Sequence, residues 1–269
     1  MVGGMLRLIG LGLYGEGGIS VQGMSEARMA DQVFAEFYTS VIPGLSLERL
    51  EASLGKRVRV LSRRDIEERA EEVLLGPARE GDVAVLVPGD PVTATTHVDL
   101  LLRARKLGVE ASLTHAASVA TAIAGATGLQ YYKFGRTVTL PMAAGGGFPA
   151  SPYVEALENF KRGLHTLILL DLDAERGLYM SVREALAYLV RLEVERRGGL
   201  ATPDRLLIGA ARVGAPDADV KGGTMESLTR HDFGGPPYCL VLPGRLHFVE
   251  AEALRVLVGV ERRLLEGSM

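Results

Sequence analysis

Short apolar runs alternate with amphipathic segments through the first 114 residues of the chain. The run from Val83 to Val87 is apolar at every position and β-branched at three of five, a composition typical of a strand buried on both faces of a parallel sheet. Runs of this kind separated by helical patterns indicate βαβ units and a mostly parallel sheet. The predicted strands are 6–9, 33–37, 58–61, 83–87 and 109–114, and the predicted helices are 20–31, 47–54, 64–75 and 97–106.

A turn follows the central apolar run at Pro88-Gly89-Asp90-Pro91. Proline donates no hydrogen bond to a sheet and glycine permits a sharp change of direction, so the strand ends here. Thr95 or Thr96 is predicted to cap the following helix. Asp90 and Thr93 then lie at the carboxyl end of a central strand, where open α/β sheets bind ligands. An isolated Gly-Asp-Pro is more often a tight turn without a ligand, and the pattern by itself leaves that alternative open.

The pattern changes after residue 114. Strands and helices alternate less regularly there, which predicts a mixed sheet. Ser181 and Glu184 have the spacing of a capping box, and Gly198 and Gly199 are expected to close the helix that it opens. A glycine-rich loop at 144–151 is expected to be mobile. The other predicted elements are helices at 119–125 and 246–265 and strands at 132–141, 164–171, 206–213 and 238–242.

Together these patterns predict an α/β fold in two domains. Residues 1–114 are expected to form an N-terminal α/β domain around a mostly parallel sheet. Residues 115–269 are expected to form a C-terminal α/β domain around a mixed sheet, with the crossing at 115–118.

The run from Gly10 to Gly15 matches the G-x-G-x-x-G fingerprint of dinucleotide-binding folds. The fingerprint works only when its glycines open a helix whose N-terminus holds the pyrophosphate. Here Gly17 and Gly18 follow closely, and each glycine disfavours a helix by about 1 kcal/mol. We therefore expect a ligand-facing loop over 10–18 and a helix that starts near Ser20. A nicotinamide-binding oxidoreductase remains the weaker alternative.

Composition and charge limit the kinds of binding partner that we expect for this protein. A net charge of −3 argues against an electrostatic nucleic-acid surface, and no apolar run approaches the roughly 20 residues of a membrane helix. No signal-peptide pattern is visible at the N-terminus. Cys239 is the only cysteine and lies in an apolar run, so we expect a small core residue, no intrachain disulfide and a cytoplasmic location.

Several chemistries are not supported by the motifs. The chain has neither a G-x-S-x-G elbow nor a phosphate-binding G-x-x-x-x-G-K-[ST] loop. Its five histidines are scattered without a helical i, i+4 pair, so no metal site is predicted. His97 and His115 flank predicted strand ends and are the histidines expected to face a pocket. No catalytic residue is assigned.

Longer runs carry a family resemblance. They are I-G-L-G-L at 9–13, F-A-E-F-Y-T-S at 34–40, P-G-D-P at 88–91 with A-T-T-H at 94–97, H-A at 115–116 with Ser118, Y-K-F-G at 132–135, G-L-H-T-L at 163–167, F-G at 233–234 with P-P at 236–237, and P-G at 243–244 with L-H at 246–247. In these runs, which span nearly the whole chain in order, the sequence resembles the diphthine synthases, S-adenosylmethionine-dependent methyltransferases of the tetrapyrrole methylase fold. The G-D-P run marks only the wider fold, whereas the F-A-E-F-Y-T-S, Y-K-F-G and G-L-H-T-L runs separate this family from tetrapyrrole and ribosomal RNA relatives.

The resemblance implies a homodimer in which S-adenosylmethionine lies in the cleft between the two α/β domains. It implies methylation of the amino group of 3-amino-3-carboxypropyl-histidine on translation elongation factor 2, a step of diphthamide biosynthesis. A methyltransferase of the same fold acting on another substrate, such as a tetrapyrrole, is the alternative. The family usually carries histidine where Tyr238 stands. The cofactor contacts carried over by motif are Leu13, Asp90, Thr93, Ser118, Val119, Leu170, Val213 and Tyr238.

Overall fold

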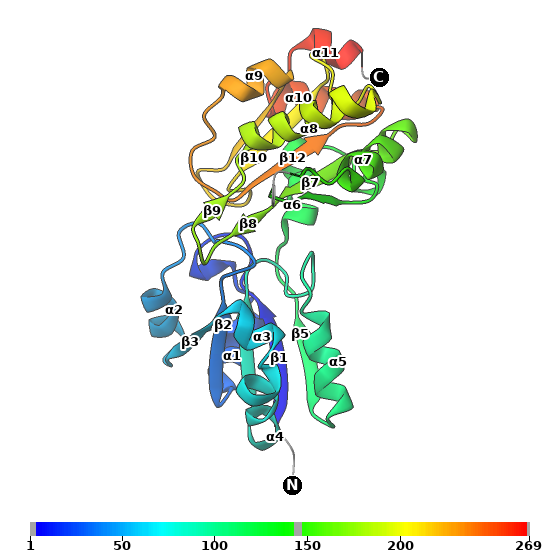
Figure 1. Cartoon of the computed structure of the whole chain (residues 1–269). Coiled ribbons are helices and arrows are strands. Elements are labelled where there is room, and N and C mark those ends of the chain that lie inside the picture. Colours follow the sequence, from blue (N-terminus) through cyan, green and yellow to red (C-terminus); the bar gives the residue numbers. More distant parts are fainter. Residues whose placement is uncertain (1–3, 143–146, 268–269) are drawn as a thin grey trace. The chain divides into compact units, whose positions relative to one another are not determined.

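The computed structural model describes residues 4–142 and 147–267, which fall into two compact units (Figure 1). Unit 1 contains the described residues up to Val119 and the turn Asp173–Gly177. Unit 2 contains Ala120–Leu172 and the described residues from Leu178 onward. The loop 115–118, which the sequence assigned to the second domain, therefore lies in unit 1.

Unit 1 is built on a five-stranded sheet in the order β3-β2-β4-β1-β5. Every pairing in it is parallel, with Leu8 of β1 beside Val85 of β4. The five predicted strands are confirmed within one residue at each end. Their bounds are β1 (Met5–Gly10), β2 (Gln32–Glu36), β3 (Val58–Leu61), β4 (Val83–Val87) and β5 (Glu110–Thr114).

Helices cover both faces of this sheet, which is why its strands read as continuous apolar runs. Leu8 and Val85 pack with the helices on one face, and Ile9 and Leu86 pack on the other, as the alternation of side chains along a strand requires. The first face is covered by α3 (Arg63–Glu67), the π-helical turn η2 (Glu71–Leu75), α4 (Pro77–Glu80) and α5 (Val98–Lys106), and the second by α1 (Val21–Met29) and α2 (Leu47–Leu54).

Two predictions in unit 1 are wrong in detail. The single helix predicted over 64–75 is interrupted: α3 ends at Glu67, and the chain continues as a π turn over Glu71–Leu75, where Val73, Leu74 and Leu75 are all buried. The predicted threonine cap of α5 is also wrong. His97 occupies the N-cap without a side-chain cap, and the Thr95 hydroxyl donates instead to the Pro91 carbonyl at 2.9 Å.

Unit 2 contains a second five-stranded sheet, in the order β11-β10-β12-β7-β6. Its β6–β7 pairing is parallel and the others are antiparallel, so the predicted mixed sheet is confirmed. A two-stranded ribbon of β8 (Leu172–Asp173) and β9 (Leu178–Tyr179) is separate. The five strands are β6 (Val138–Leu140), β7 (Thr166–Leu170), β10 (Leu207–Ala211), β11 (Asp219–Gly223) and β12 (Tyr238–Leu242).

The helices of unit 2 confirm some predictions and correct others. The capping box of Ser181 and Glu184 is present, although the helix ends one residue before Gly198, at a left-handed Arg197. The predicted helix over 246–265 is split in two near Gly259, whose φ of 71° is left-handed. The sequence analysis missed α7, α9 and β11. The bounds are α6 (Val119–Thr127), α7 (Ser151–Lys161), α8 (Val182–Arg196), α9 (Met225–Arg230), α10 (Phe248–Leu257) and α11 (Arg262–Glu266).

The strand predicted over 132–141 is reduced to β6. Tyr131–Lys133 forms a 3-10 turn, η3. The backbone of Arg136 bonds to the side chain of Asn159 instead of a neighbouring strand, with N–H to Oδ1 at 3.1 Å and carbonyl to Nδ2 at 2.8 Å. The glycine-rich loop predicted over 144–151 lies partly outside the described residues. Within the described parts of the chain, no helix is long and apolar enough to cross a membrane.

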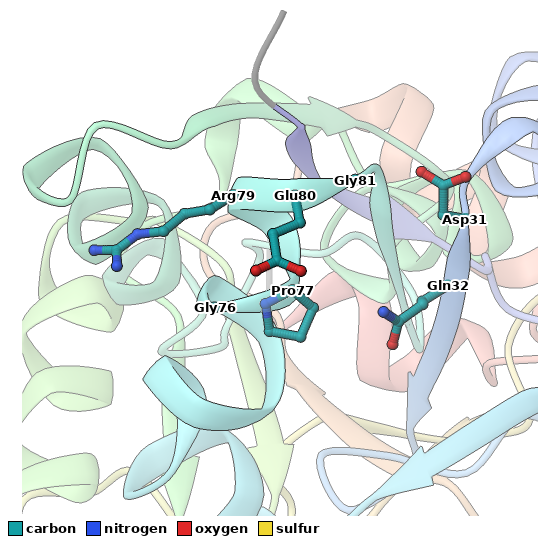
Figure 2. Close-up of a pocket in the computed structure, with 7 residues that line it drawn as sticks. All are labelled: Asp31, Gln32, Gly76, Pro77, Arg79, Glu80 and Gly81. Carbon is teal, nitrogen blue, oxygen red and sulfur yellow. The ribbon is translucent and has the colours of Figure 1, made fainter. Parts of the chain in front are cut away.

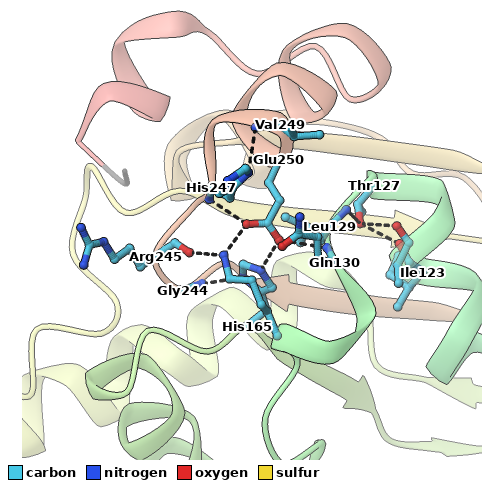
Figure 3. Close-up of polar contacts among 12 residues, drawn as sticks. Ile123, Thr127, Leu129, Gln130, His165, Gly244, Arg245, His247, Val249 and Glu250 are labelled. Atoms are coloured by element: carbon cyan, nitrogen blue, oxygen red, sulfur yellow. Dashed lines mark hydrogen bonds and ion pairs between the residues drawn. The ribbon is translucent and has the colours of Figure 1, made fainter.

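A buried glutamate, Glu250, joins three segments of unit 2 (Figure 3). Its carboxylate accepts hydrogen bonds from His165 Nε2 at 2.9 Å, from the Gln130 N–H at 2.9 Å and from the His247 N–H at 2.8 Å, and it pairs with Lys133. Glu250 thereby fixes the start of α10 against η3 and against the residue that precedes β7.

We predict that Glu250→Gln lowers the free energy of unfolding by about 1–3 kcal/mol at neutral pH, because several buried donors lose part of their acceptor. Burial raises the pKa of the Glu250 carboxyl, but the His247 N–H, Lys133, the Gln130 N–H and His165 outweigh it and hold the pKa at about 2. A folded-state pKa below the usual 4.5 stabilises the fold above that usual value. This stabilisation is lost as the pH falls from about 5 toward 2.

Urea unfolding of the wild type and of Glu250→Gln at neutral and acid pH measures this loss of stability. The gap in stability between the wild type and Glu250→Gln should narrow as the pH falls. A gap that is unchanged at about pH 3 would contradict the assigned network.

Candidate functional site

Two neighbouring strands of unit 1, β1 and β4, are followed by helices that pack on opposite faces of the sheet. Strand β1 leads to α1, whose Ala27 packs on one face, and the adjacent β4 leads to α5, whose Leu100 packs on the other. Such a switch point opens a crevice at the carboxyl ends of the strands, where α/β sheets bind ligands. Leu13 follows β1, and Asp90 and Thr93 follow β4, so the structure places these three predicted residues at the switch point.

Backbone hydrogen bonds join the loops after β1 and β4. The Gly12 N–H donates to the Gly89 carbonyl at 3.1 Å and the Gly89 N–H donates to the Gly12 carbonyl at 2.9 Å. The Leu11 N–H adds a bond to the Val87 carbonyl at 2.8 Å. Both glycines are left-handed, with φ of 73° and 66°, which a residue with a side chain rarely adopts. The two loops therefore behave as one paired element.

The loop after β5 packs onto this pair at Gly10. A Cβ built on Gly10 would lie 2.6 Å from the Gly89 carbonyl oxygen and 2.7 Å from Cβ of Ala116, so only glycine fits there. Ser118 is buried in that third loop, and the half-buried Val119 begins α6. Four of the five predicted contacts of unit 1 thus lie in three loops at the ends of adjacent strands, and Val119 begins the helix that follows the third loop.

Asp90 is the buried acidic side chain of this site. Its Oδ1 accepts from the Val92 N–H at 3.2 Å and from the Thr93 hydroxyl at 2.9 Å, and its Oδ2 lies 2.7 Å from Nδ1 of His115. Burial raises the pKa of the Asp90 carboxyl, but these hydrogen bonds, His115 first, outweigh it and the net pKa is below the usual value. Asp90 is therefore a fixed negative charge that joins two of the three loops.

The two histidines expected near the pocket differ in their surroundings. His115 bonds to Asp90 and its side chain is 67% exposed. His97 is buried, with its Nε2 3.2 Å from the carboxylate of Glu36 at the end of β2. The sequence analysis missed Glu36 as a site residue, although a carboxylate that ends the apolar run Val33–Ala35 is a visible signal.

The three predicted contacts of unit 2 lie at the same end of three neighbouring strands of its sheet. Leu170 ends β7, Val213 follows the end of β10, and Tyr238 begins β12. The antiparallel register places Ala211 opposite Tyr238 and Leu169 opposite Cys239, which brings these strand ends together. Leu170 and Val213 are buried apolar side chains.

Arg212, which the sequence analysis missed, holds the loop beside Tyr238. Its guanidinium donates to the Phe233 carbonyl at 2.7 Å and to Asp217 Oδ2 at 2.7 Å, and its N–H donates to the Pro237 carbonyl at 2.9 Å. The Tyr238 hydroxyl donates to the carbonyl of Gly234 in the same loop. Burial raises the pKa of Tyr238, so its phenol stays protonated and bonded within the loop.

Other candidate chemistries find no support in the described parts of the chain. Cys239 is buried, as predicted, and burial raises the pKa of its thiol to about 12, which makes it a poor nucleophile. Among residues 4–142 and 147–267, no group of three or more His, Cys, Asp or Glu side chains is placed to hold a metal ion. Directly after Gly15 the chain forms only the 3-10 turn η1 (Glu16–Gly18), and α1 begins after its N-cap Ser20, so the predicted late start of this helix is confirmed.

A hollow in unit 1 lies away from these loops (Figure 2). Its residues precede β4, or precede or begin β2, so it belongs to the amino ends of the strands, whereas Leu13 and Asp90 follow the carboxyl ends. Ligands of open α/β sheets bind at the carboxyl ends, and we assign no site to this hollow. It is lined by Asp31, Gln32, Gly76, Pro77, Arg79, Glu80 and Gly81.

Comparison with known proteins identifies the class. The profile of the family described as Tetrapyrrole (Corrin/Porphyrin) Methylases matches residues 5–229, and the chain belongs to this family of methyltransferases. The resemblance noted from the sequence is thereby confirmed at the level of the fold. The match does not support the nicotinamide-binding alternative.

Near-full-length relatives narrow the family further. The chain is 42% identical over 262 residues to the diphthine synthase of Methanothermobacter thermautotrophicus, which covers 97% of this chain and 98% of that protein. It is 45% identical over 257 residues to the diphthine synthase of Methanocella arvoryzae, covering 96% and 99%. A crystal structure of diphthine synthase superposes with a TM-score of 0.88 at 35% identity, covering 97% and 99%. Within the methylases, the chain is a member of the diphthine synthase family.

We predict that Gly10→Ala lowers the free energy of unfolding by about 1–3 kcal/mol, because its methyl group overlaps the Gly89 carbonyl and Ala116. The amide hydrogens of Gly12 and Gly89 should exchange faster, since the paired loops are forced apart. Urea unfolding and hydrogen exchange measure both effects.

Gly17→Ala is the matched control, because a Cβ at Gly17 meets nothing within 4 Å. Equal stability and equal exchange in the two variants would show that the close packing at Gly10 does not constrain the loops.

Proposed function

We propose that this methyltransferase transfers methyl from S-adenosylmethionine to the amino group of the 3-amino-3-carboxypropyl-histidine of translation elongation factor 2. This is the diphthine-forming reaction of diphthamide biosynthesis. The observation that carries the proposal is similarity to diphthine synthases at 42–45% identity over 96–97% of the chain. Fold alone would not carry it, because one fold serves several acceptors.

The proposed cofactor contacts fit the chemistry of S-adenosylmethionine. The fixed negative charge of Asp90 suits a ligand that carries a sulfonium and an ammonium group. Leu13, Val119, Leu170 and Val213 supply the apolar walls that cofactor pockets usually have. We further propose that one cofactor molecule contacts residues of both units, and that the backbone of the loop around Tyr238 makes that residue's contact.

The protein's own contribution is binding and orientation. The bound cofactor supplies an activated methyl group, and the chain holds the acceptor in line with it. Effective molarities of about 10⁵–10⁸ M show how much of the rate such alignment supplies. The acceptor amine must be neutral to attack, and we assign no general base to the chain, so the proton leaves to solvent.

We also propose that the enzyme is a cytoplasmic homodimer, as the family resemblance implies. Exposed aromatic side chains in unit 2 are candidate contacts between two copies. Tyr131 and Tyr132 follow Gln130, whose N–H bonds to Glu250 of α10, and the exposed Phe248 begins α10.

We predict that Asp90→Arg weakens binding of S-adenosylmethionine by at least about tenfold, because a cation replaces the fixed negative charge and the hydrogen bonds to Val92 and Thr93 are lost. Calorimetric titration with the cofactor, its demethylated product and NAD measures this. NAD should bind negligibly to the wild type, because α1 begins only at Val21, after Gly17 and Gly18, so the fingerprint glycines do not open a helix that could hold a pyrophosphate.

Asp204→Arg is the charge-matched control, since Asp204 is exposed and precedes β10, at the other end of that strand from Val213. Unchanged affinity in Asp90→Arg would remove the loop from the site. Micromolar binding of NAD would overturn the assignment of residues 10–18.

The acceptor is tested by radiolabel transfer from methyl-labelled cofactor. We predict labelling of elongation factor 2 that carries the aminocarboxypropyl histidine, and none of a factor whose target histidine is replaced. A short peptide should react much more slowly than the intact factor, because remote contacts contribute to transition-state binding. Equal labelling of both factors, or labelling of uroporphyrinogen, would move the assignment to another substrate.

A further inference from the structure

A second buried carboxylate lies at the carboxyl end of a strand in the unit 1 sheet. Glu36 ends β2, the strand that pairs with β4, and its side chain is fully buried. Its Oε2 accepts from the N–H groups of Tyr38 at 3.0 Å and Thr39 at 3.1 Å. Its Oε1 accepts from the Thr39 hydroxyl and lies 3.2 Å from Nε2 of His97. Glu36 therefore joins the loop after β2 to the end of the loop after β4.

The loop from Pro88 to His97 has three anchors, each on a different neighbour. Gly89 is paired with the loop after β1. Asp90 is bonded to His115, which follows β5. His97, at the last position before α5, is bonded to Glu36 of β2. The loop that carries Asp90 and Thr93 is thus held from both sides of β4.

The third anchor depends on one hydrogen bond. The His97 side chain is fully buried, and its Nδ1 has no hydrogen-bond partner among the residues that the structure describes. A carboxylate oxygen only accepts, so the imidazole must present a protonated Nε2 to Glu36. Nothing else polar among the described residues fixes the His97 ring, so loss of Glu36 as acceptor releases it.

We propose that Glu36 is a positioning residue that acts through His97 to hold the cofactor loop in its binding geometry. The inference rests on the proposed function, because it assumes that the Asp90 loop binds S-adenosylmethionine. Neither Glu36 nor His97 need touch the cofactor. Their role is to raise the fraction of molecules whose loop is ready to bind.

Loss of the Glu36–His97 bond should weaken cofactor binding much more than it slows methyl transfer. When only a fraction of molecules is competent to bind, the apparent dissociation constant rises by the reciprocal of that fraction. A loop that keeps its geometry for about one tenth of the time therefore binds the cofactor about tenfold more weakly. The methyl-transfer rate at saturating cofactor should change by less than about twofold, because bound cofactor selects the ordered loop.

The test compares three variants with the wild type. His97→Leu removes the donor to Glu36 and should raise the dissociation constant of S-adenosylmethionine about tenfold by calorimetry. His97→Gln keeps a side-chain N–H donor that can reach Glu36, and it should recover most of the affinity. His97→Phe removes the same donor but fills the site with a ring, and it serves, with the same expected loss of affinity, if His97→Leu does not fold.

Glu250→Gln is the matched control. It weakens the hydrogen bonds of a second buried glutamate–histidine pair, whose His165 precedes β7, whereas Leu170 ends that strand. It should lower stability without raising the dissociation constant.

The outcomes separate the two proposals. A wild type that does not bind S-adenosylmethionine would remove both. A wild type that binds, beside variants with unchanged affinity, would overturn the role of Glu36 and leave the proposed function standing. A large fall in methyl transfer at saturating cofactor with unchanged affinity would also overturn positioning, and so would a failure of His97→Gln to restore binding.

Discussion

The pairing of two glycine-containing loops at the switch point of unit 1 is the constraint on which the site depends. Gly12 and Gly89 bond to each other through their backbones, and Gly10 leaves no space for a side chain beneath them. Without this close approach, the loops after β1, β4 and β5 could not pack together at the carboxyl ends of their strands. The close packing of these loops at Gly10, Gly12 and Gly89 therefore determines where Asp90 lies.

Much of unit 1 could be predicted because its strands are buried on both faces. A continuous apolar run such as Val83–Val87 has few alternatives, so strand bounds and the position of Asp90 at a strand end follow from the sequence. The π turn at Glu71–Leu75 could not be predicted, since it depends on which residues the core buries. Nor could β6 be bounded, because the partner of Arg136 is the side chain of Asn159, from a helix that the pattern did not reveal.

Some residues of the candidate site could likewise be predicted from the sequence, and others could not. Sequence motifs placed Leu13, Asp90 and Thr93 correctly at strand ends, because a strand end is a local property. The partners of Glu36 and Arg212 could not be predicted, although the position of Glu36 at the end of an apolar run is a visible signal. Each acts on a partner that is distant in sequence, as in the 61-residue separation between Glu36 and His97, and no local pattern records that separation.

Several of the runs that carry the family resemblance meet in the structure at two buried glutamates. In unit 1, Glu36 of the F-A-E-F-Y-T-S run bonds to His97 of the A-T-T-H run. In unit 2, Glu250 bonds to Lys133 of Y-K-F-G, to His165 of G-L-H-T-L and to the backbone of His247 in P-G-R-L-H. A buried carboxylate requires several donors, and donors from separate segments meet it only when those segments adopt one arrangement. In this chain these runs therefore belong to two buried hydrogen-bond networks, one of which includes His97 at the end of the loop that carries Asp90.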